Sequence, residues 1–245
     1  MKKRGLKWLA ILLIPIAIIT ACFIYLATYS PADDDSIAAF AESGEEYLDE
    51  RGNMVFEPSE KTDIGFIFYP GGKVEASAYT PLARLLAQNG ILCIITPMPF
   101  NLAIFDTGAA ESVISSNKGI NRWYIGGHSL GGSMAASYAA NNEGKIEGLV
   151  LLAAYSTEEI SIPTLSLIAT EDGVLNHEKY EENKKNCIGD FIEHTIQGGC
   201  HAYFGMYGTQ KGDGNPEISA EEQIAISAEL ITDFIASTNK TNDRS

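Results

Sequence analysis

The stretch that decides the fold is residues 123–134, which read Trp123-Tyr124-Ile125-Gly126-Gly127-His128-Ser129-Leu130-Gly131-Gly132-Ser133-Met134. An apolar run rich in aromatic and β-branched residues ends at two glycines, a serine follows, and small helix-forming residues begin after two more glycines. This order predicts a strand, a sharp turn and a helix. The spacing Gly127-x-Ser129-x-Gly131 is typical of a nucleophile elbow, where only glycine fits beside a serine in a strained conformation. We therefore expect Ser129 to be a nucleophile.

The five-residue pattern alone is weak evidence, because average residue usage produces it by chance in roughly one chain in ten of this length. The rest of the chain supplies the context. Apolar runs predict further strands at 54–56, 64–69, 91–96, 146–154, 165–169 and 191–196. Amphipathic stretches predict helices at 76–89, 130–142, 177–186 and 218–238, and a partly helical segment at 97–117. Such alternation predicts an α/β fold with a mostly parallel sheet and helices on both faces.

Bulk composition limits the class of protein. The chain has 245 residues, of which 45% are hydrophobic and 20% charged, which suits one globular domain with an appendage. The net charge of −15 would repel phosphate backbones and anionic lipid headgroups, so we expect no nucleic-acid partner. The cysteines show no metal-ligand spacing, and we expect all four to be unpaired: Cys22, Cys93, Cys187 and Cys200.

Residues 1–30 have the composition of a membrane anchor or a signal sequence. Four basic residues precede an uncharged apolar run from Trp8 to Tyr29, about 33 Å long as a helix and sufficient to cross a bilayer. Basic residues before the run and acidic residues after it predict a single-pass transmembrane helix with a cytoplasmic N-terminus and an extracytoplasmic domain. Two alternatives stay open, a lipoprotein with Cys22 as the lipidated residue and a signal sequence cleaved after Ala32.

Residues 31–53 are acidic and form a predicted spacer before a domain at 54–245. Between Asp33 and Glu50 the apolar residues recur at helical spacing, which predicts a short amphipathic helix with Ile37, Phe40, Ala41, Tyr47 and Leu48 on one face.

A serine nucleophile needs a base to remove its proton, and histidine is the usual one. His128 lies inside the elbow, where its side chain would point away from the nucleophile, and His194 alternates within a predicted strand. His177 opens a predicted helix. His201 follows the last predicted strand in a glycine-bounded loop, at the edge of the sheet where open α/β folds bind ligands. We therefore assign His201 as the base.

The third member should be an acid that fixes the histidine tautomer and stabilises its positive charge. The predicted strand at 165–169 is followed by Glu171 and Asp172. Asp172 is the better candidate, because it is shorter and stands in a turn before Gly173, and Glu171 is the fallback. The order Ser129, Asp172, His201 is the chain order of the α/β-hydrolase superfamily.

Acyl transfer also needs two main-chain donors for the developing oxyanion. Leu130 follows the nucleophile and would supply one N–H at the N-terminus of its helix. The second would come from Gly72 or Lys73, in the glycine-containing loop after the predicted strand at 64–69.

Several motifs are similar to those of a bacterial α/β-hydrolase subfamily related to the dienelactone hydrolases, and the likeness runs from about Val55 to Ile231. They are Phe68-Tyr69-Pro70-Gly71-Gly72-Lys73-Val74, Ala78-Tyr79-x-Pro81-Leu82-Ala83, Met98-Pro99-Phe100-Asn101-Leu102-Ala103, Gly126-Gly127-His128-Ser129-Leu130-Gly131-Gly132 and Gly198-Gly199-Cys200-His201-Ala202-x-Phe204-Gly205-x-Tyr207-Gly208-x-Gln210-x-Gly212-Asp213-Gly214. The resemblance implies an α/β-hydrolase fold with Ser129, Asp172 and His201 as the triad. Cys200 stands where such sequences tend to have asparagine, which leaves the hydrogen bonding of the His201 loop open.

The predicted site is shallow and has no cap domain, because only residues 155–162 separate two of the predicted strands, where many esterases insert a helical cap. We expect Tyr203, Phe204, Met206, Tyr207 and the segment 97–105, including Phe100, to line it, although the aromatic loop could equally be core. Asp213 is interpreted as a turn residue, because one acid supplies too few ligands for a metal.

The sequence therefore predicts a serine hydrolase that cleaves a small carboxylic ester or thioester, with no metal and no cofactor. Its expected partners are the small-molecule substrate and, through the N-terminal helix, the membrane. Two alternatives stay open: a peptidase or acyltransferase with the same triad, and a non-catalytic binding protein that keeps the fold. Oligomeric state is not predicted.

Overall fold

The structure is a computed structural model that describes residues 2–34, 38 and 46–242. In these ranges one sheet of eight strands has the order β1-β2-β4-β3-β5-β6-β7-β8. The strands β3 to β8 run parallel to one another, whereas β2 is antiparallel to β4 and β1 is antiparallel to β2. Their bounds are β1 Glu46–Leu48, β2 Met54–Phe56, β3 Ile64–Tyr69, β4 Leu92–Ile95, β5 Arg122–His128, β6 Gly148–Leu152, β7 Thr164–Ala169 and β8 Phe191–Ile196.

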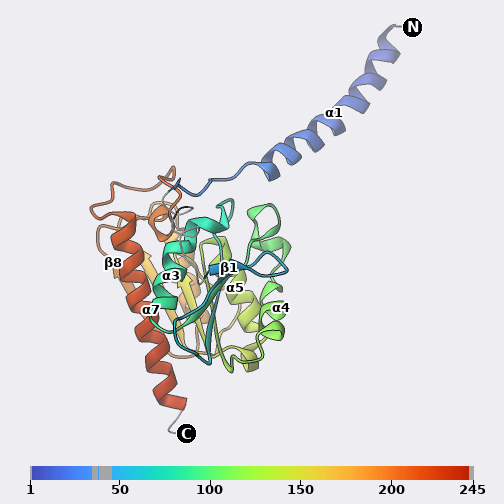
Figure 1. The fold of residues 1–245 in the computed structure, drawn as a ribbon. Coiled ribbons are helices and arrows are strands. Elements are labelled where there is room, and N and C mark those ends of the chain that lie inside the picture. The colour runs from blue at the N-terminus through green and yellow to red at the C-terminus, as the bar shows by residue number, and fades with distance from the viewer. Residues whose placement is uncertain (1, 35–37, 39–45, 243–245) are drawn as a thin grey trace.

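Helices cover both faces of this sheet (Figure 1). α3 packs against α7 on one face, and α5 packs against β5 and β6 on the other, beside α4. The predicted mostly parallel sheet with helices on both faces is confirmed. The α-helices are α1 Lys2–Ala27, α3 Thr80–Gln88, α4 Ala109–Ser116, α5 Leu130–Ala140, α6 His177–Asn183 and α7 Ala220–Asn242. The 3₁₀ helices are η1 Ala76–Tyr79, η2 Pro99–Asn101, η3 Ala103–Phe105, η4 Glu143–Lys145, η5 Lys184–Asn186 and η6 Ala202–Phe204.

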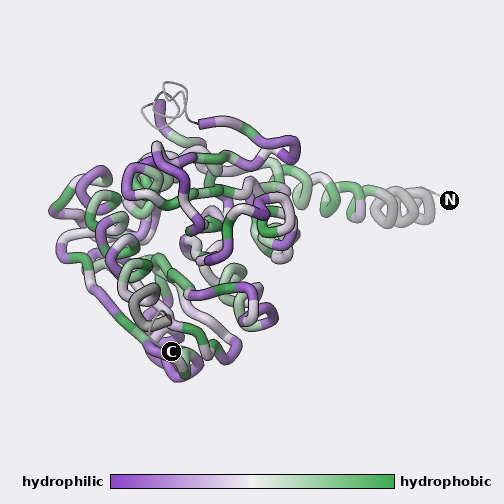
Figure 2. The backbone as a smooth tube through the Cα atoms, turned by 60° about the horizontal axis from the view of Figure 1, so that its bottom comes forward, coloured by the Kyte–Doolittle hydropathy of each residue, from purple (hydrophilic) through white to green (hydrophobic). Residues whose placement is uncertain are grey.

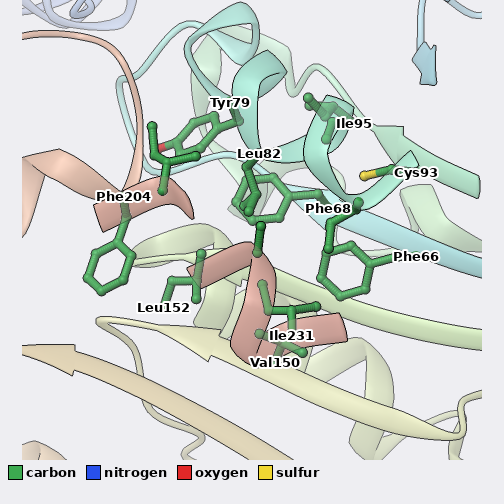
Figure 3. Packing of buried hydrophobic residues seen from close by; sticks show 14 of the residues in the cluster. Phe66, Phe68, Tyr79, Leu82, Cys93, Ile95, Val150, Leu152, Phe204 and Ile231 are labelled. Atoms are coloured by element: carbon green, nitrogen blue, oxygen red, sulfur yellow. The ribbon is translucent and has the colours of Figure 1, made fainter. Parts of the chain in front are cut away.

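Two hydrophobic cores lie on opposite faces of the sheet, because successive strand residues point to opposite sides. In β3, Phe66 and Phe68 face α3 and α7, while Ile67 and Tyr69 face α5. Figure 3 shows the first core, where Phe66 and Phe68 pack with residues of β4, β6 and α7. Burial of each such side chain stabilises the fold by roughly 1.5–3 kcal/mol. The central strands are therefore apolar on both faces. Because both faces are covered by packed side chains, the site forms at the ends of the strands.

The segment predicted as one helix at 76–89 is divided into η1 and α3. Pro81 lies in the first turn of α3, where its missing N–H costs nothing. The division places Tyr79 at the junction, buried beneath the loop that follows β3.

The spacer at 31–53 differs from its predicted helix at residues 46–48, whereas the described residues Asp34 and Ala38 are helical. Tyr47 and Leu48 lie in β1, which pairs antiparallel with β2, so the helix prediction is wrong for them. The edge of β2 offers main-chain hydrogen-bonding groups that a local helix could not pair, and the Tyr47 hydroxyl donates to Glu57 Oε1 at 2.8 Å. Ile37, Phe40 and Ala41 lie outside the described residues.

The N-terminal helix α1 extends away from the body of the protein, with apolar stretches along its described part (Figures 1 and 2). It begins at Lys2, contains Pro15 and ends at Ala27, so it includes both the basic residues at the start of the chain and most of the apolar run at 8–29. In the part of the chain that the structure describes, no helix is long and apolar enough to cross a bilayer. The prediction of an N-terminal transmembrane helix is therefore wrong, and the membrane partner loses its support. Lipidation at Cys22 and cleavage after Ala32 stay predictions.

Candidate active site

Ser129 lies in the turn between β5 and α5 with φ 52° and ψ −121°. A non-glycine residue at positive φ is strained by about 1–3 kcal/mol and persists only where its surroundings hold it. Two main-chain hydrogen bonds do so: the Ser129 N–H donates to Leu152 O at 2.9 Å, and Ser133 N–H donates to Ser129 O at 3.1 Å. The turn is thus tied to β6 on one side and to the first turn of α5 on the other.

The glycines of the motif are required by close packing of the main chain. A Cβ on Gly131 would collide with the carbonyl oxygens of Tyr69 and Pro70, and one on Gly127 would lie 2.5 Å from Tyr69 O. Real Cβ atoms do not come so close to main-chain atoms. Glycine at both positions therefore lets α5 approach the end of β3, which brings the loop after β3 next to Ser129.

The predicted acid and base are in contact. His201 Nδ1 lies 2.8 Å from Asp172 Oδ2, and the two residues are only 2% and 4% exposed. The other carboxylate oxygen, Asp172 Oδ1, accepts the N–H groups of Val174 at 2.9 Å and Leu175 at 2.8 Å. Asp172 therefore holds the histidine, and the fallback Glu171 does not.

Asp172 stays ionised although it is buried. Burial by itself would raise the pKa of this carboxyl group. The hydrogen bond and charge of His201, together with the N–H groups of Leu175 and Val174, outweigh burial and lower the pKa below its ordinary value. An ionised Asp172 accepts a proton-bearing Nδ1, so His201 Nε2 is the ring nitrogen left for another partner.

Ser129 and His201 line the same cavity, which has a volume of ≈ 260 Å³. It opens at the carboxyl ends of β5, β6 and β7, the edge where parallel sheets bind ligands. The other lining residues are Leu130, Ser133, Ala153, Ala154, Tyr155, Val174, Leu175 and Asn176. The structure thus places Ser129 at the same cavity as His201, which is paired with Asp172.

The aromatic loop follows the core alternative, and neither it nor Phe100 is among the residues that line the cavity. Phe204, Met206 and Tyr207 are buried in the first core, with Tyr203 packed against it, because η6 turns this loop inward. Phe100 is 52% exposed, at φ 56°, and packs edge-to-face on Phe105. Apart from the turn and first residues of α5 and His201, the lining residues follow β6 and β7, so the signal for them was their position directly after predicted strands.

The predicted oxyanion donors differ in availability. Leu130 N–H belongs to the first turn of α5, where main-chain N–H groups have no intrahelical acceptor. A Cβ on Gly72 would lie 2.9 Å from Leu130 Cδ2, so the loop after β3 directly faces Leu130. Lys73 N–H already donates to Asn101 O at 2.6 Å, which makes Gly72 the better donor. The Lys73 side chain turns away to the carbonyls of Tyr25 and Leu26 at the end of α1.

Two residues that brace the His201 loop were not predicted. Gln223 of α7 is fully buried; its Oε1 accepts Cys200 N–H at 2.9 Å and its Nε2 donates to Cys200 O at 2.8 Å. Asp213 accepts the N–H groups of His201 at 2.9 Å and Ala202 at 3.0 Å. These bonds hold the main chain on both sides of His201, whatever the residue type at position 200.

Cys200 itself is inert in this setting. Burial, with the nearby Asp213 carboxylate, raises the pKa of its thiol to about 11. A protonated thiol is a poor nucleophile, so Cys200 does not compete with Ser129. In the described ranges, no group of three His, Cys, Asp or Glu side chains is arranged to hold a metal ion.

The other histidines lie outside the acid–base pair. His194 is exposed on β8, and His177 uses Nε2 to contact Asp172 O at 2.8 Å from the start of α6. His128 is buried directly before Ser129, and its ring packs against that of His201 with 4.5 Å between the ring centroids. It is therefore a neighbour of the predicted base.

The sequence and the fold were compared with known proteins. A family model described as "Alpha/beta hydrolase family" matches residues 65–225, which is more than half of the chain. No curated protein matches the sequence.

Similar solved structures include three bacterial or archaeal proteins at low sequence identity. Est1E from Butyrivibrio proteoclasticus is 14% identical, with a TM-score of 0.59 over 79% of this chain and 100% of that chain. Butyrate-bound Est2, an esterase from Thermogutta terrifontis, is 13% identical, with a TM-score of 0.56 over 80% and 95%. A predicted CIB-like hydrolase from Thermoplasma acidophilum is 16% identical, with a TM-score of 0.54 over 77% and 97%. These similarities establish the shared fold.

Proposed function

Because the chain belongs to the α/β-hydrolase family, we propose that it is a serine hydrolase that cleaves small carboxylic esters or thioesters. The observation that carries the proposal is the strained Ser129 in the same cavity as a buried, Asp172-bound His201. A buried, hydrogen-bonded Asp–His pair that only stabilised the fold would gain little, since apolar residues of similar volume are often as good.

The proposed reaction has two acyl-transfer steps. His201 Nε2 takes the proton of Ser129 as Oγ attacks the carbonyl carbon, and the proton then goes to the leaving alcohol or thiol. Water, deprotonated in turn by His201, attacks the acyl carbon, and His201 returns that proton to Ser129 Oγ as the bond to the acyl group breaks and the acid is released. Ionised Asp172 stabilises the positive charge that His201 carries at both tetrahedral intermediates.

We assign the oxyanion to the main-chain N–H groups of Leu130 and Gly72. The first turn of α5 and the adjacent loop after β3 support this choice. Lys73 is not assigned, because its N–H is occupied by Asn101.

The cavity supports a substrate with a short acyl chain. Its volume of ≈ 260 Å³ lies below the usual range for drug-sized ligands, about 300–1,000 Å³. Two of the similar structures contain small carboxylic acids, ferulic acid in Est1E and butyrate in Est2. Acids of this class are products that ester hydrolysis would release.

A chain-length series tests the proposal. We expect the purified protein to hydrolyse nitrophenyl acetate and butyrate, with kcat/KM at least about tenfold lower for the dodecanoate, because each methylene that does not fit loses its contribution. Matched thioesters should also react, whereas the anilide of the preferred acid should react far more slowly. Preference for the anilide would favour a peptidase, and absence of turnover on every ester and thioester would contradict the proposal.

A further inference from the structure

A buried tyrosine hydroxyl joins three parts of the proposed site. Tyr79 ends η1 and is 1% exposed in the first core (Figure 3). Its hydroxyl oxygen accepts Gly71 N–H at 3.0 Å and lies 2.8 Å from His128 Nδ1. A Cβ on Gly71 would lie 2.6 Å from that oxygen and 2.7 Å from His128 Nδ1, so the three groups are tightly packed.

The direction of these hydrogen bonds follows from the donors available. Gly71 N–H can only donate, so the Tyr79 oxygen accepts it. The Tyr79 proton then goes to His128 Nδ1, because the opposite assignment would leave two buried groups unpaired, the hydroxyl proton and the Nε2 lone pair, whereas this one leaves only the Nε2–H. His128 is therefore a neutral imidazole with its proton on Nε2.

Burial and the charge of His201 keep His128 neutral. They hold the pKa of His128 well below its ordinary value, and the main chain of His201 has a smaller, opposite effect. The His128 ring packs against the His201 ring, 4.5 Å away between centroids. A neutral ring at this position does not oppose the positive charge that His201 takes up in the proposed reaction.

The network connects segments that are far apart in the sequence. Gly71 precedes the proposed oxyanion donor Gly72, His128 precedes the nucleophile Ser129, and the His128 ring contacts the base His201. Displacing a donor or a reacting group by a fraction of an ångström lowers catalysis without removing any catalytic group.

We propose that Tyr79 is a positioning residue that acts through His128 and Gly71: its hydroxyl sets the oxyanion loop, the turn at Ser129 and the ring of His201 relative to one another. The inference rests on the proposed function. It assigns to the histidine of the elbow a role that is separate from acid–base chemistry.

The test compares Tyr79→Phe with a matched control, Tyr69→Phe. Tyr69 is equally buried, and its hydroxyl also bridges two main-chain groups, donating to Thr107 O at 2.8 Å and accepting Ala110 N–H at 2.9 Å. Both variants should lose similar stability in thermal unfolding. Tyr79→Phe should lower kcat on nitrophenyl butyrate by about 10- to 100-fold with KM within about threefold, less than the loss of a whole oxyanion donor. Tyr69→Phe should retain kcat.

A second readout reports on the oxyanion site directly. A trifluoromethyl ketone forms a tetrahedral adduct with an active serine, so its inhibition constant should rise in Tyr79→Phe in parallel with the loss of kcat/KM. His128→Asn places an amide oxygen near the position of Nδ1 and should recover most of the activity that His128→Leu loses.

The outcomes separate this inference from the proposed function. Equal kcat and equal ketone affinity in the two tyrosine variants would overturn the positioning role, while the wild type still hydrolysed the ester. A wild-type protein that neither turned over esters nor bound the ketone would overturn the proposed function, and the inference with it.

Discussion

Ser129→Ala should abolish ester hydrolysis, lowering kcat by about 10⁴-fold or more, because loss of the nucleophile removes the acyl-enzyme route altogether. The variant should fold normally, since the turn is held by main-chain hydrogen bonds to Leu152 and Ser133 that alanine keeps. The measurement is kcat on nitrophenyl butyrate, with circular dichroism to verify the fold.

Ser137→Ala is the matched control for this substitution. Ser137 lies on the same helix, α5, and does not line the cavity that contains Ser129. It should retain wild-type kcat within about twofold, as expected of a surface substitution. Residual activity in Ser129→Ala above about one per cent of wild type would argue against the serine mechanism, which predicts a loss of about 10⁴-fold.

Asp172→Asn should lower kcat by about 10³- to 10⁴-fold at neutral pH. The amide can occupy the same space, but it cannot stabilise the positive charge on His201, and it favours the wrong histidine tautomer. Glu171→Gln is the control, because Glu171 does not contact the His201 ring in the structure; it should change kcat only a few-fold. A larger effect of Glu171→Gln than of Asp172→Asn would reverse the assignment of the acid.

The same variant should change how stability depends on acid. The folded-state pKa of Asp172 is lowered, so its ionised form contributes stability above the unfolded value of about 3.9, and this contribution is lost as the pH falls through the folded-state pKa. Asparagine cannot gain that proton. From about pH 5 downward, the wild type should therefore lose stability faster than Asp172→Asn in urea unfolding. Parallel curves would contradict a lowered pKa at Asp172.

Much of the candidate site could be predicted because short sequence patterns specify where Ser129, Asp172 and His201 lie in the fold. The glycines around Ser129 are required by close main-chain packing, and this requirement appears in the sequence as a pattern of a few residues. His201 and Asp172 each follow a strand of a parallel sheet, and the carboxyl ends of such strands meet at one edge. Correct prediction of the strands was therefore enough to place the three residues at one edge of the sheet.

The supporting contacts could not be predicted, because no local pattern encodes them. Gln223 lies in α7 and hydrogen-bonds both main-chain groups of Cys200. No sequence pattern around Gln223 indicates this contact. Asp213 was interpreted as a turn, because a single acid cannot hold a metal; its partners are main-chain N–H groups instead. Tyr47 and Leu48 have helical spacing, but the free edge of β2 pairs them as a strand.

Mapping a covalent adduct tests the role of Ser129 as the nucleophile. The folded protein should be treated with a fluorophosphonate, digested, and sequenced by mass spectrometry. We expect a single phosphonyl adduct on Ser129, formed slowly or not at all in Asp172→Asn. An adduct on another residue, or none on folded protein, would contradict it.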